Sequence, residues 1–254
     1  MKRLVIKVGT AVLTEDNTKL AMQRIKNLVK FISKLKKEKK LEIILVSSGA
    51  VGAGYTVLQL DKKILANKQA LAAIGQPKLM KTYQEMFEEY DITVAQMLFI
   101  ADDFDSRKRS QNAKNVMEIL LKNEVLPIIN ENDVIATEEL IGDNDQLAAY
   151  ITHYFKADML AILTDIDGYY DKNPREFSDA KLQKIVTKIS EDELNKKPNA
   201  NSKFATGGIV TKLKAADFLM QKDIPMYLSS GFDLTNAYDF LLEGNHKSGT
   251  IFKK

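Results

Sequence analysis

Short apolar runs alternate with longer segments of helical periodicity along the chain, and this alternation restricts the fold more than any other feature. The runs that read as buried strands cover residues 3–8, 42–46, 92–97, 125–129, 158–163, 224–229 and 249–252. Apolar residues recur at the spacing of an α-helix over residues 22–35, 64–90, 106–123, 147–151, 206–221 and 234–242. We expect an interruption of the 64–90 helix at Gly75-Gln76-Pro77. Repeated strand–helix units favour a mostly parallel sheet with helices on both faces, which is an α/β fold.

The length and composition fit one large α/β domain. A chain of 254 residues, of which 45% are hydrophobic, can bury a sizeable core. It contains no internal repeat, no low-complexity tract and no stretch that reads as a linker. We therefore expect a single domain that spans residues 1–254.

Several kinds of chemistry are excluded by what the chain lacks. It has no cysteine and only two histidines, which excludes disulfides, thiolate metal sites and histidine-rich metal sites, so that any metal would have oxygen ligands. The net charge of +3 does not predict binding to nucleic acid. The N-terminus runs straight into a strand, and no apolar run approaches the length of a membrane span. We therefore expect a cytoplasmic protein without a membrane partner.

Two bursts of carboxamides and carboxylates are the most distinctive polar feature. Residues 130–133 (Asn-Glu-Asn-Asp) follow an apolar strand, and residues 143–145 (Asp-Asn-Asp) lie at the start of a helix, where backbone N–H groups lack helical partners. A loop that merely caps the helix is the simpler alternative. Capping needs only one such residue, however, so the two bursts favour a ligand site.

Glycines, hydroxyls and lysines occur where phosphate-binding segments would carry them. Lys7 lies at the tip of the first strand, just before Gly9, and residues 206–212 (Thr-Gly-Gly-Ile-Val-Thr-Lys) open a helix whose N-terminus could cradle an anion. A flexible loop before an amphipathic helix is the alternative for the second segment. Residues 47–54 are small, but their glycine order differs from a dinucleotide-binding fingerprint, and the chain has no Walker A sequence.

The polar residues that follow the predicted strands should meet at one edge of the sheet. Lys7, Ser48, residues 130–133 and the pair Thr164-Asp165 all come directly after such strands. In open parallel sheets, ligands bind beyond the carboxyl ends of the strands. Thr164-Asp165 alone fits an Asx turn equally well. The shared position of these motifs nevertheless predicts a single binding crevice.

With these motifs in place, the chain resembles the amino acid kinase family, and within it the branch that phosphorylates glutamate. The motifs that carry the resemblance are Val5-Ile6-Lys7-Val8-Gly9-Thr10, Ser47-Ser48-Gly49-Ala50, Ile129-Asn130-Glu131-Asn132-Asp133, Gly142-Asp143-Asn144-Asp145, Leu163-Thr164-Asp165 and Thr206-Gly207-Gly208 through Lys212. The resemblance implies a three-layer α/β/α sandwich that binds ATP at the C-terminal half of the sheet edge and glutamate at the N-terminal half. Many bacterial members of this branch carry a further C-terminal PUA domain, and the end at Lys254 predicts an active short form without it.

The resemblance also implies roles for individual residues. Those expected to bind the amino acid are Ser48, Gly49, Asp133 and Asn144. Those expected to bind ATP are Lys7, Gly9, Thr164, Asp165, Thr206, Gly207, Gly208, Ile209, Val210, Thr211 and Lys212. Lys7 and Lys212 are the expected catalytic lysines, and we interpret Asp145 as an organiser that orients their ammonium groups. Mg²⁺ should bridge the phosphates of ATP, with few protein ligands and several waters.

The implied reaction is ATP-dependent phosphorylation of the side-chain carboxylate of L-glutamate to L-glutamyl 5-phosphate, the first step of proline biosynthesis. Transfer between two anions needs positive charge and fixed N–H donors, but a carboxylate that is already ionised needs no general base. The resemblance further implies a homo-oligomer, and proline as a candidate feedback inhibitor.

Two alternatives compete with this activity. An acetylglutamate kinase, or another carboxylate or carbamate kinase of the same fold, would need a pocket that accepts an amide in place of a free amine. Asp133 argues against such a pocket, because a charged amine relieves the cost of a buried carboxylate. A catalytically silent amino-acid sensor would keep the ligand pocket, but the presence of both Lys7 and Lys212 argues against it.

Overall fold

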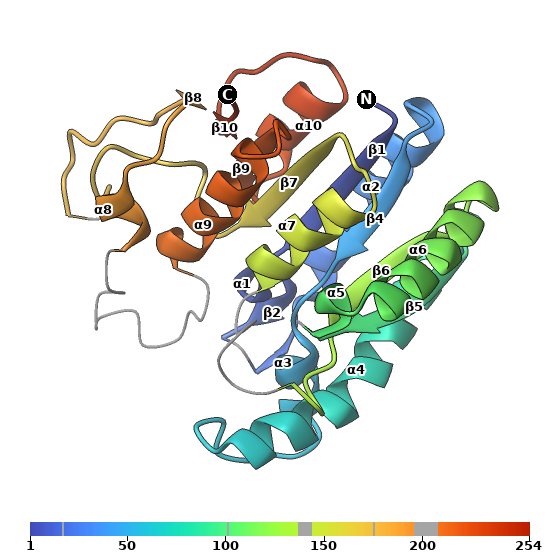
Figure 1. Cartoon of the computed structure of the whole chain (residues 1–254). Helices are drawn as coiled ribbons and strands as arrows, with labels where there is room; N and C mark the ends of the chain where they lie inside the picture. The colour runs from blue at the N-terminus through green and yellow to red at the C-terminus, as the bar shows by residue number, and fades with distance from the viewer. Residues whose placement is uncertain (17, 101, 137–143, 175, 196–207) are drawn as a thin grey trace.

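A central sheet organises the protein. The computed structural model describes residues 1–16, 18–100, 102–136, 144–174, 176–195 and 208–254. Within these residues the main sheet has eight strands, in the order β5 (Val94–Phe99), β6 (Leu126–Glu131), β4 (Glu42–Val46), β1 (Arg3–Val8), β7 (Met159–Thr164), β9 (Met226–Ser230), β10 (Thr250–Phe252) and β8 (Ile185–Val186) (Figure 1). Neighbouring strands run parallel except for the antiparallel pair β9 and β10. The predicted mostly parallel sheet is therefore confirmed.

Helices cover both faces of the sheet and complete a three-layer sandwich (Figure 1). One hydrophobic core is closed by α1 (Thr10–Leu13), α2 (Met22–Glu38), α3 (Ala50–Tyr55), α4 (Leu65–Glu88) and α10 (Thr235–Leu241). The other core is closed by α5 (Asp102–Asp105), α6 (Arg107–Lys122), α7 (Asn144–Tyr154) and α9 (Ile209–Met220), with α8 (Glu191–Leu194) at its margin. Successive residues of β1 point into opposite cores, Val5 into one and Ile6 into the other. The predicted α/β/α architecture is confirmed.

The predicted elements differ from the observed ones by only a residue or two at most strand ends. Helix α2 shows why periodicity succeeds, because Ile25, Leu28, Ile32 and Leu35 form one fully or nearly fully buried stripe. Within the described part of the chain, no helix combines the length and hydrophobicity that a membrane span requires.

The predicted interruption at Gly75-Gln76-Pro77 is wrong, because α4 continues through it with Pro77 inside the helix. Close packing of α3 against α4 explains why the glycine is there. A Cβ atom at Gly75 would lie 1.8 Å from the carbonyl oxygen of Ala50, and one at Gly54 would lie 1.9 Å from that of Leu71. Both glycines therefore let two helix backbones touch, and the glycine at position 54 serves packing rather than the approach of a ligand.

A short antiparallel pair, β2 (Thr14–Glu15) and β3 (Lys19–Leu20), was not predicted from the sequence. Strands of two residues are too short to show a period. The pair lies close to Gly49, since a Cβ atom on this glycine would be 3.6 Å from Cγ2 of Thr14. Gly49 has φ +94°, a conformation that favours glycine, and it forms the N-cap of α3. The pair therefore borders the carboxyl edge of the sheet.

Candidate active site

The carboxyl ends of the central strands lie side by side. Strand β1 is hydrogen-bonded to β4 on one side and to β7 on the other. Just beyond these strands, the backbone N–H of Gly9 donates to the carbonyl of Leu163 at 3.0 Å, and that of Ser47 donates to the carbonyl of Ile129 at 2.8 Å. The residues that follow β1, β4, β6 and β7 therefore share one edge, as expected for a parallel sheet.

A lysine–aspartate cluster, made of Lys7, Asp145 and Lys212, lies at this edge. Lys7 comes from the end of β1, Asp145 from the first turn of α7 and Lys212 from the first turn of α9. The Nζ atom of Lys7 lies 2.5 Å from Oδ1 of Asp145, and the Nζ atom of Lys212 lies 3.1 Å from Oδ2. The three side chains are at most 4% exposed. Residues that are more than two hundred positions apart in the chain thus form one charged group.

The electrostatics of the cluster favour an anion. Burial alone would raise the pKa of the Asp145 carboxyl, but the ammonium groups of Lys7 and Lys212 outweigh it, so that this pKa lies well below its ordinary value. Asp145 is therefore ionised near neutral pH, and its carboxylate is a weak base. Counted over these three side chains alone, the cluster holds two ammonium groups and one carboxylate away from water, and this sum of charges suits a phosphate group.

Several other residues predicted to bind the nucleotide lie at the same edge as the cluster. The hydroxyl of Thr164, at the end of β7, donates to Oδ1 of Asp165 at 3.0 Å. A Cβ atom at Gly9 would lie 3.6 Å from the Thr164 hydroxyl, which places the turn after β1 against the end of β7. The hydroxyl of Thr211 lies 3.2 Å from Oδ2 of Asp145. Gly208 is the N-cap of α9, which continues through Ile209 and Val210, whereas Thr206 and Gly207 lie outside the described residues.

A chain of carboxamides, made of Asn144, Asn130, Gln76 and Gln96, occupies the neighbouring part of the edge. Nδ2 of Asn144 lies 2.7 Å from the carbonyl of Ser47, 3.0 Å from the hydroxyl of Ser48 and 2.9 Å from Oδ1 of Asn130. The side chain of Asn130 then donates to Gln76 at 2.8 Å, and that of Gln76 donates to Gln96 at 3.0 Å. The structure thus brings Asn144 and Ser48 together, next to the cluster.

The sequence pattern predicts neither Gln76 nor Gln96 as a site residue. It places Gln76 in a helix break and Gln96 in a strand. The signal lies in the structure, where Gln76 is on the inner side of α4 and only 9% exposed. A glutamine so deeply buried needs hydrogen-bond partners.

Asp133 lies in the turn after β6 and is half-buried. Burial raises the pKa of its carboxyl, and the nearby ammonium of Lys68, on α4, partly opposes the rise. The residues of the two polar bursts thus lie in different parts of the site. Asn130 is buried in the sheet, Asn144 joins the carboxamide chain and Asp145 joins the lysines, while Asp143 lies outside the described residues.

Comparisons with known proteins agree with this architecture. The model of the amino acid kinase family matches residues 2–230. The chain is 55% identical to the glutamate 5-kinase of Wolinella succinogenes, over 99% of this chain and 98% of the other. It is 52% identical to the glutamate 5-kinase of Leishmania donovani, over 99% of this chain and 95% of the other.

The chain belongs to the amino acid kinase family. A solved structure of the same fold is that of the carbamate kinase from Giardia lamblia bound to AMP-PNP, with a TM-score of 0.69. The two chains are 16% identical, and the match covers 100% of this chain and 98% of the other. At that identity the likeness concerns the fold alone. As an amino acid kinase, the protein carries its charged cluster and carboxamide chain on strands of the central sheet and on the helices packed beside them.

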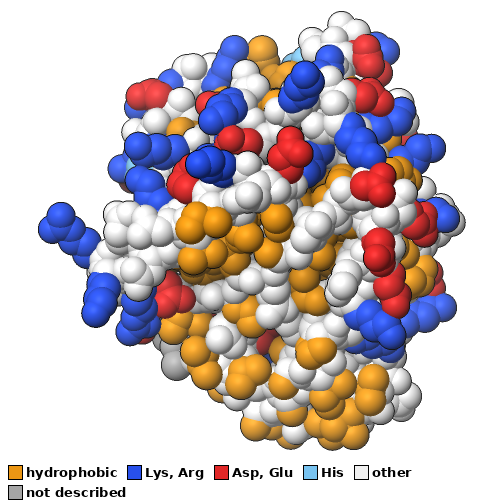
Figure 2. Space-filling view, turned by 90° about the vertical axis from the view of Figure 1, so that its right-hand side faces the viewer, with side chains coloured by type: hydrophobic (Ala, Val, Ile, Leu, Met, Phe, Trp, Pro, Cys, Tyr) orange, Lys and Arg blue, Asp and Glu red, His pale blue; other side chains and the backbone are white. Residues whose placement is uncertain are grey.

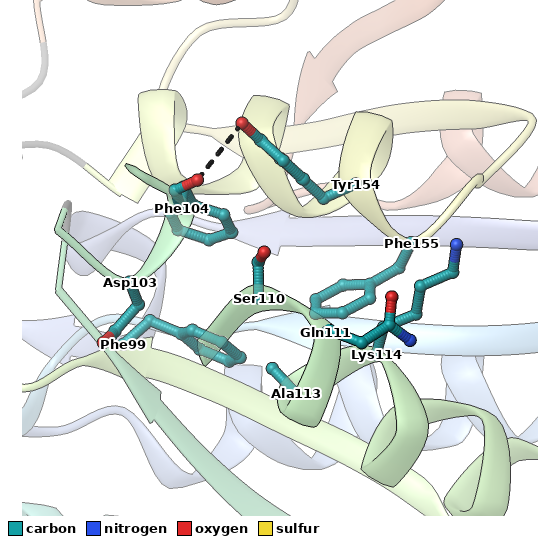
Figure 3. Close-up of a pocket in the computed structure, with 9 residues that line it drawn as sticks. All are labelled: Phe99, Asp103, Phe104, Ser110, Gln111, Ala113, Lys114, Tyr154 and Phe155. Carbon is teal, nitrogen blue, oxygen red and sulfur yellow. Dashed lines mark hydrogen bonds between the residues drawn. The ribbon is translucent and has the colours of Figure 1, made fainter. Parts of the chain in front are cut away.

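A pocket of this amino acid kinase lies apart from the candidate site. It is a cavity of about 160 Å³ between the end of β5 and helices α5, α6 and α7. Its lining consists of Phe99, Asp103, Phe104, Ser110, Gln111, Ala113, Lys114, Tyr154 and Phe155 (Figure 3). The hydroxyl of Tyr154 donates to the carbonyl of Phe104 at 3.4 Å. None of these residues belongs to the lysine–aspartate cluster or to the carboxamide chain.

Proposed function

We propose that the protein transfers the terminal phosphoryl group of ATP to the side-chain carboxylate of L-glutamate, with L-glutamyl 5-phosphate and ADP as products. This reaction is the first step of proline biosynthesis. The observation that carries the proposal is the 55% identity to a glutamate 5-kinase over 99% of the chain. The buried lysine–aspartate cluster supplies the chemistry that such a transfer needs.

In this proposal Lys7 and Lys212 stabilise the negative charge that develops on the transferred phosphoryl group. Both ammonium groups are fixed by Asp145, so that little reorganisation is needed when the charge develops. Asp145 acts as an organiser rather than as a base. The carboxylate of glutamate attacks the γ-phosphorus of ATP directly, the bond from that phosphorus to the β,γ-bridging oxygen breaks, and ADP leaves with this oxygen, so that no proton has to be moved.

ATP is proposed to lie over the ends of β1 and β7 and the start of α9. Gly9, Thr164 and Asp165 would contact it from the strand side, and residues 206–212, with Gly208, Ile209, Val210 and Thr211 among them, from the helix side. The N-terminus of α9 favours an anion through its unpaired N–H groups. The complex of Giardia carbamate kinase with AMP-PNP supports a nucleotide site in this fold.

Mg²⁺ is proposed to be held by the phosphates of ATP and by water. The two oxygens of Asp145 face lysine ammonium groups, which makes this carboxylate a poor metal ligand. The oxygens of Thr164 and Asp165 have the chemistry that Mg²⁺ prefers and could hold its waters. When bound, the ion would neutralise part of the charge on the phosphates.

The amino acid is proposed to bind between Ser48, Gly49, Asp133 and Asn144. Its α-ammonium would be attracted by the Asp133 carboxylate, whose burial is costly without a cationic partner. Asn144 and Ser48 offer neutral hydrogen-bonding groups at the same end of the molecule. We further propose proline as a candidate feedback inhibitor, since it carries the same α-ammonium and α-carboxylate groups.

The protein is proposed to work in the cytoplasm as a homo-oligomer with its single domain formed by residues 1–254. One side of the molecule supports self-association: β5 is an edge strand, and α6 exposes Val116 at 47% and Ile119 at 62%. Figure 2, which looks onto this side, shows hydrophobic side chains gathered over its middle and lower parts. Light scattering on the purified protein would test the proposal, which a monomer at all concentrations would contradict.

The proposed reaction can be tested by ADP release from Mg-ATP in the presence of glutamate, N-acetylglutamate, aspartate or carbamate. We expect turnover with glutamate alone. Turnover with N-acetylglutamate or carbamate in place of glutamate would overturn the proposed substrate. No ADP release with any of the four would overturn the proposed activity.

A further inference from the structure

We propose that Gln76 is a positioning residue, which acts through Asn130 to hold the carbonyl of Asn144 as a hydrogen-bond acceptor for the α-ammonium of the amino acid. The inference rests on the proposed function, because it assumes that a free amino acid binds beside Asn144. It concerns how the site distinguishes a free amine from other groups. The side chain of Gln76 is hydrogen-bonded to Asn130 and to Gln96. Neither glutamine takes part in the ion pairs that define the lysine–aspartate cluster among the described residues.

The carboxamide chain has one direction. Asn144 donates through Nδ2 to Oδ1 of Asn130, Asn130 donates through Nδ2 to Oε1 of Gln76, and Gln76 donates through Nε2 to Oε1 of Gln96. The three distances are 2.9, 2.8 and 3.0 Å. A series of amides that all point the same way polarises its members and strengthens each hydrogen bond.

Backbone groups fix this direction. The N–H of Glu131 donates to Oδ1 of Asn130 at 3.0 Å, and the carbonyl of Ser47 accepts from Nδ2 of Asn144 at 2.7 Å. If the amide of Asn130 turned over, its Nδ2 would face that N–H, and two donors would oppose each other. The orientation of both asparagines therefore follows from chemistry rather than from packing alone.

The inner end of the chain presents a buried acceptor. Among the residues that the structure describes, Oδ1 of Asn144 is buried and has no hydrogen-bond partner. Leaving such an oxygen without a donor is costly. All three neighbours of Nδ2 act as acceptors, so Oδ1 points away from them and needs a donor from elsewhere. An ammonium group supplies such a donor, whereas a carboxylate oxygen would be repelled.

Gln76 secures the middle of the chain. Asn130 is only 2% exposed, so its Nδ2 cannot turn to water if Gln76 is lost. It would instead compete for nearby acceptors, including those that hold Asn144. The outer residue, Gln96, is exposed and can be replaced by water. We therefore expect a larger effect at position 76 than at position 96.

The test compares Gln76→Leu with Gln76→Glu in steady-state kinetics. Gln76→Leu removes the acceptor for Asn130 and should raise the KM for glutamate about five- to tenfold, since one hydrogen bond in the network is lost. Gln76→Glu keeps an acceptor oxygen, toward which the exposed amide of Gln96 can also turn, and should restore most of the glutamate affinity. The KM for ATP should stay near that of the wild type in both variants.

A purely structural role for Gln76 predicts the opposite order. A buried carboxylate destabilises a fold more than a leucine does, so Gln76→Glu would then be the more damaged variant. Gln96→Leu is expected to fold normally and to raise the KM for glutamate only slightly, about twofold. Thr82→Val, which removes another buried polar group from α4, serves as the matched control and should leave the glutamate KM unchanged.

The outcomes separate the inference from the proposed function. A wild-type protein without glutamate turnover would overturn the proposed function. With wild-type turnover present, the inference is overturned by an unchanged glutamate KM in Gln76→Leu. It is also overturned by equal rises in the KM for glutamate and for ATP, or by a glutamate KM in Gln76→Glu as poor as in Gln76→Leu.

Discussion

The lysine–aspartate cluster and the carboxamide chain meet at consecutive residues, Asp145 and Asn144, but the cluster consists of charged side chains and the carboxamide chain of neutral ones. The cluster concentrates ions: both oxygens of Asp145 face ammonium groups at 2.5 and 3.1 Å. The carboxamide chain is neutral, and its hydrogen bonds run in one direction. The difference shows how one helix start can serve two neighbouring tasks, one that needs charge and one that needs orientation.

The proposed reaction explains why the lysine–aspartate cluster is charged and the carboxamide chain is neutral. Charge develops on the transferred phosphoryl group, so fixed ammonium groups at that place lower the barrier. The α-amino end of glutamate does not react, so groups that bind it affect the ground state and the transition state alike. Losses in the cluster should therefore appear in kcat, and losses at the amino-acid end should appear in KM.

The largest expected effect comes from removal of a lysine from the cluster. Lys212→Ala or Lys7→Ala should lower kcat on the order of a hundredfold or more, because a donor that stabilises developing charge is lost. The KM for glutamate should change much less. Initial rates with both substrates varied provide the measurement.

Lys214→Ala is the matched control for Lys212→Ala, since it removes an exposed lysine from the same helix. It should behave like the wild type. A Lys7→Ala protein with near wild-type kcat would contradict the proposed role of the cluster in phosphoryl transfer.

An intermediate effect is expected at the amino-acid end. Asp133→Ala should raise the KM for glutamate at least tenfold, about 1.4 kcal/mol, because the α-ammonium loses its charged partner. The KM for ATP should move little. Asp105→Ala, which removes an exposed carboxylate from α5, is the control. A loss confined to ATP would mean that Asp133 does not face the amino acid.

The smallest expected effect concerns pH. Burial raises the pKa of Asp133 and Lys68 opposes the rise, so Lys68→Met should raise this pKa further. As the pH falls through the raised pKa, Asp133 takes up a proton and loses its attraction for ammonium. The rise of the glutamate KM toward acid pH should therefore begin at a higher pH in Lys68→Met than in the wild type. On the acid side, the KM of the variant should exceed that of the wild type about two- to threefold.

The pH series is measured with wild type, Lys68→Met and Lys81→Met, where Lys81 is an exposed lysine of the same helix. The Lys81→Met profile should match that of the wild type. A Lys68→Met profile shifted toward lower pH would contradict the role assigned to Lys68.

Most of the fold could be predicted from the sequence because buried strands and amphipathic helices carry clear periods. The run Leu4-Val5-Ile6 and the stripe on α2 are examples. The convergence of Lys7, Ser48 and Thr164 also followed, since parallel strands end at a common edge. Their roles toward the substrates are still proposals.

Other features depend on contacts between distant segments, which a period does not reveal. The sequence pattern at Gly75 is that of a helix break, and only the approach of α3 in the folded protein explains why a glycine stands within a continuous helix. Gln76 and Gln96 lie on different elements, and their link to Asn130 arises from packing of α4 beside β5 and β6. The partial opposition of Lys68 to the raised pKa of Asp133 likewise needs the folded arrangement.

The most direct test of the separation between the two regions is a double-mutant cycle with Lys212→Ala and Asp133→Ala. If the regions act on different steps, the double variant should combine the kcat of Lys212→Ala with the glutamate KM of Asp133→Ala. Its loss in kcat/KM should then equal the product of the single losses, within about 0.5 kcal/mol. A double variant no worse than the more damaged single variant would show that both residues act on one step, and would contradict the account.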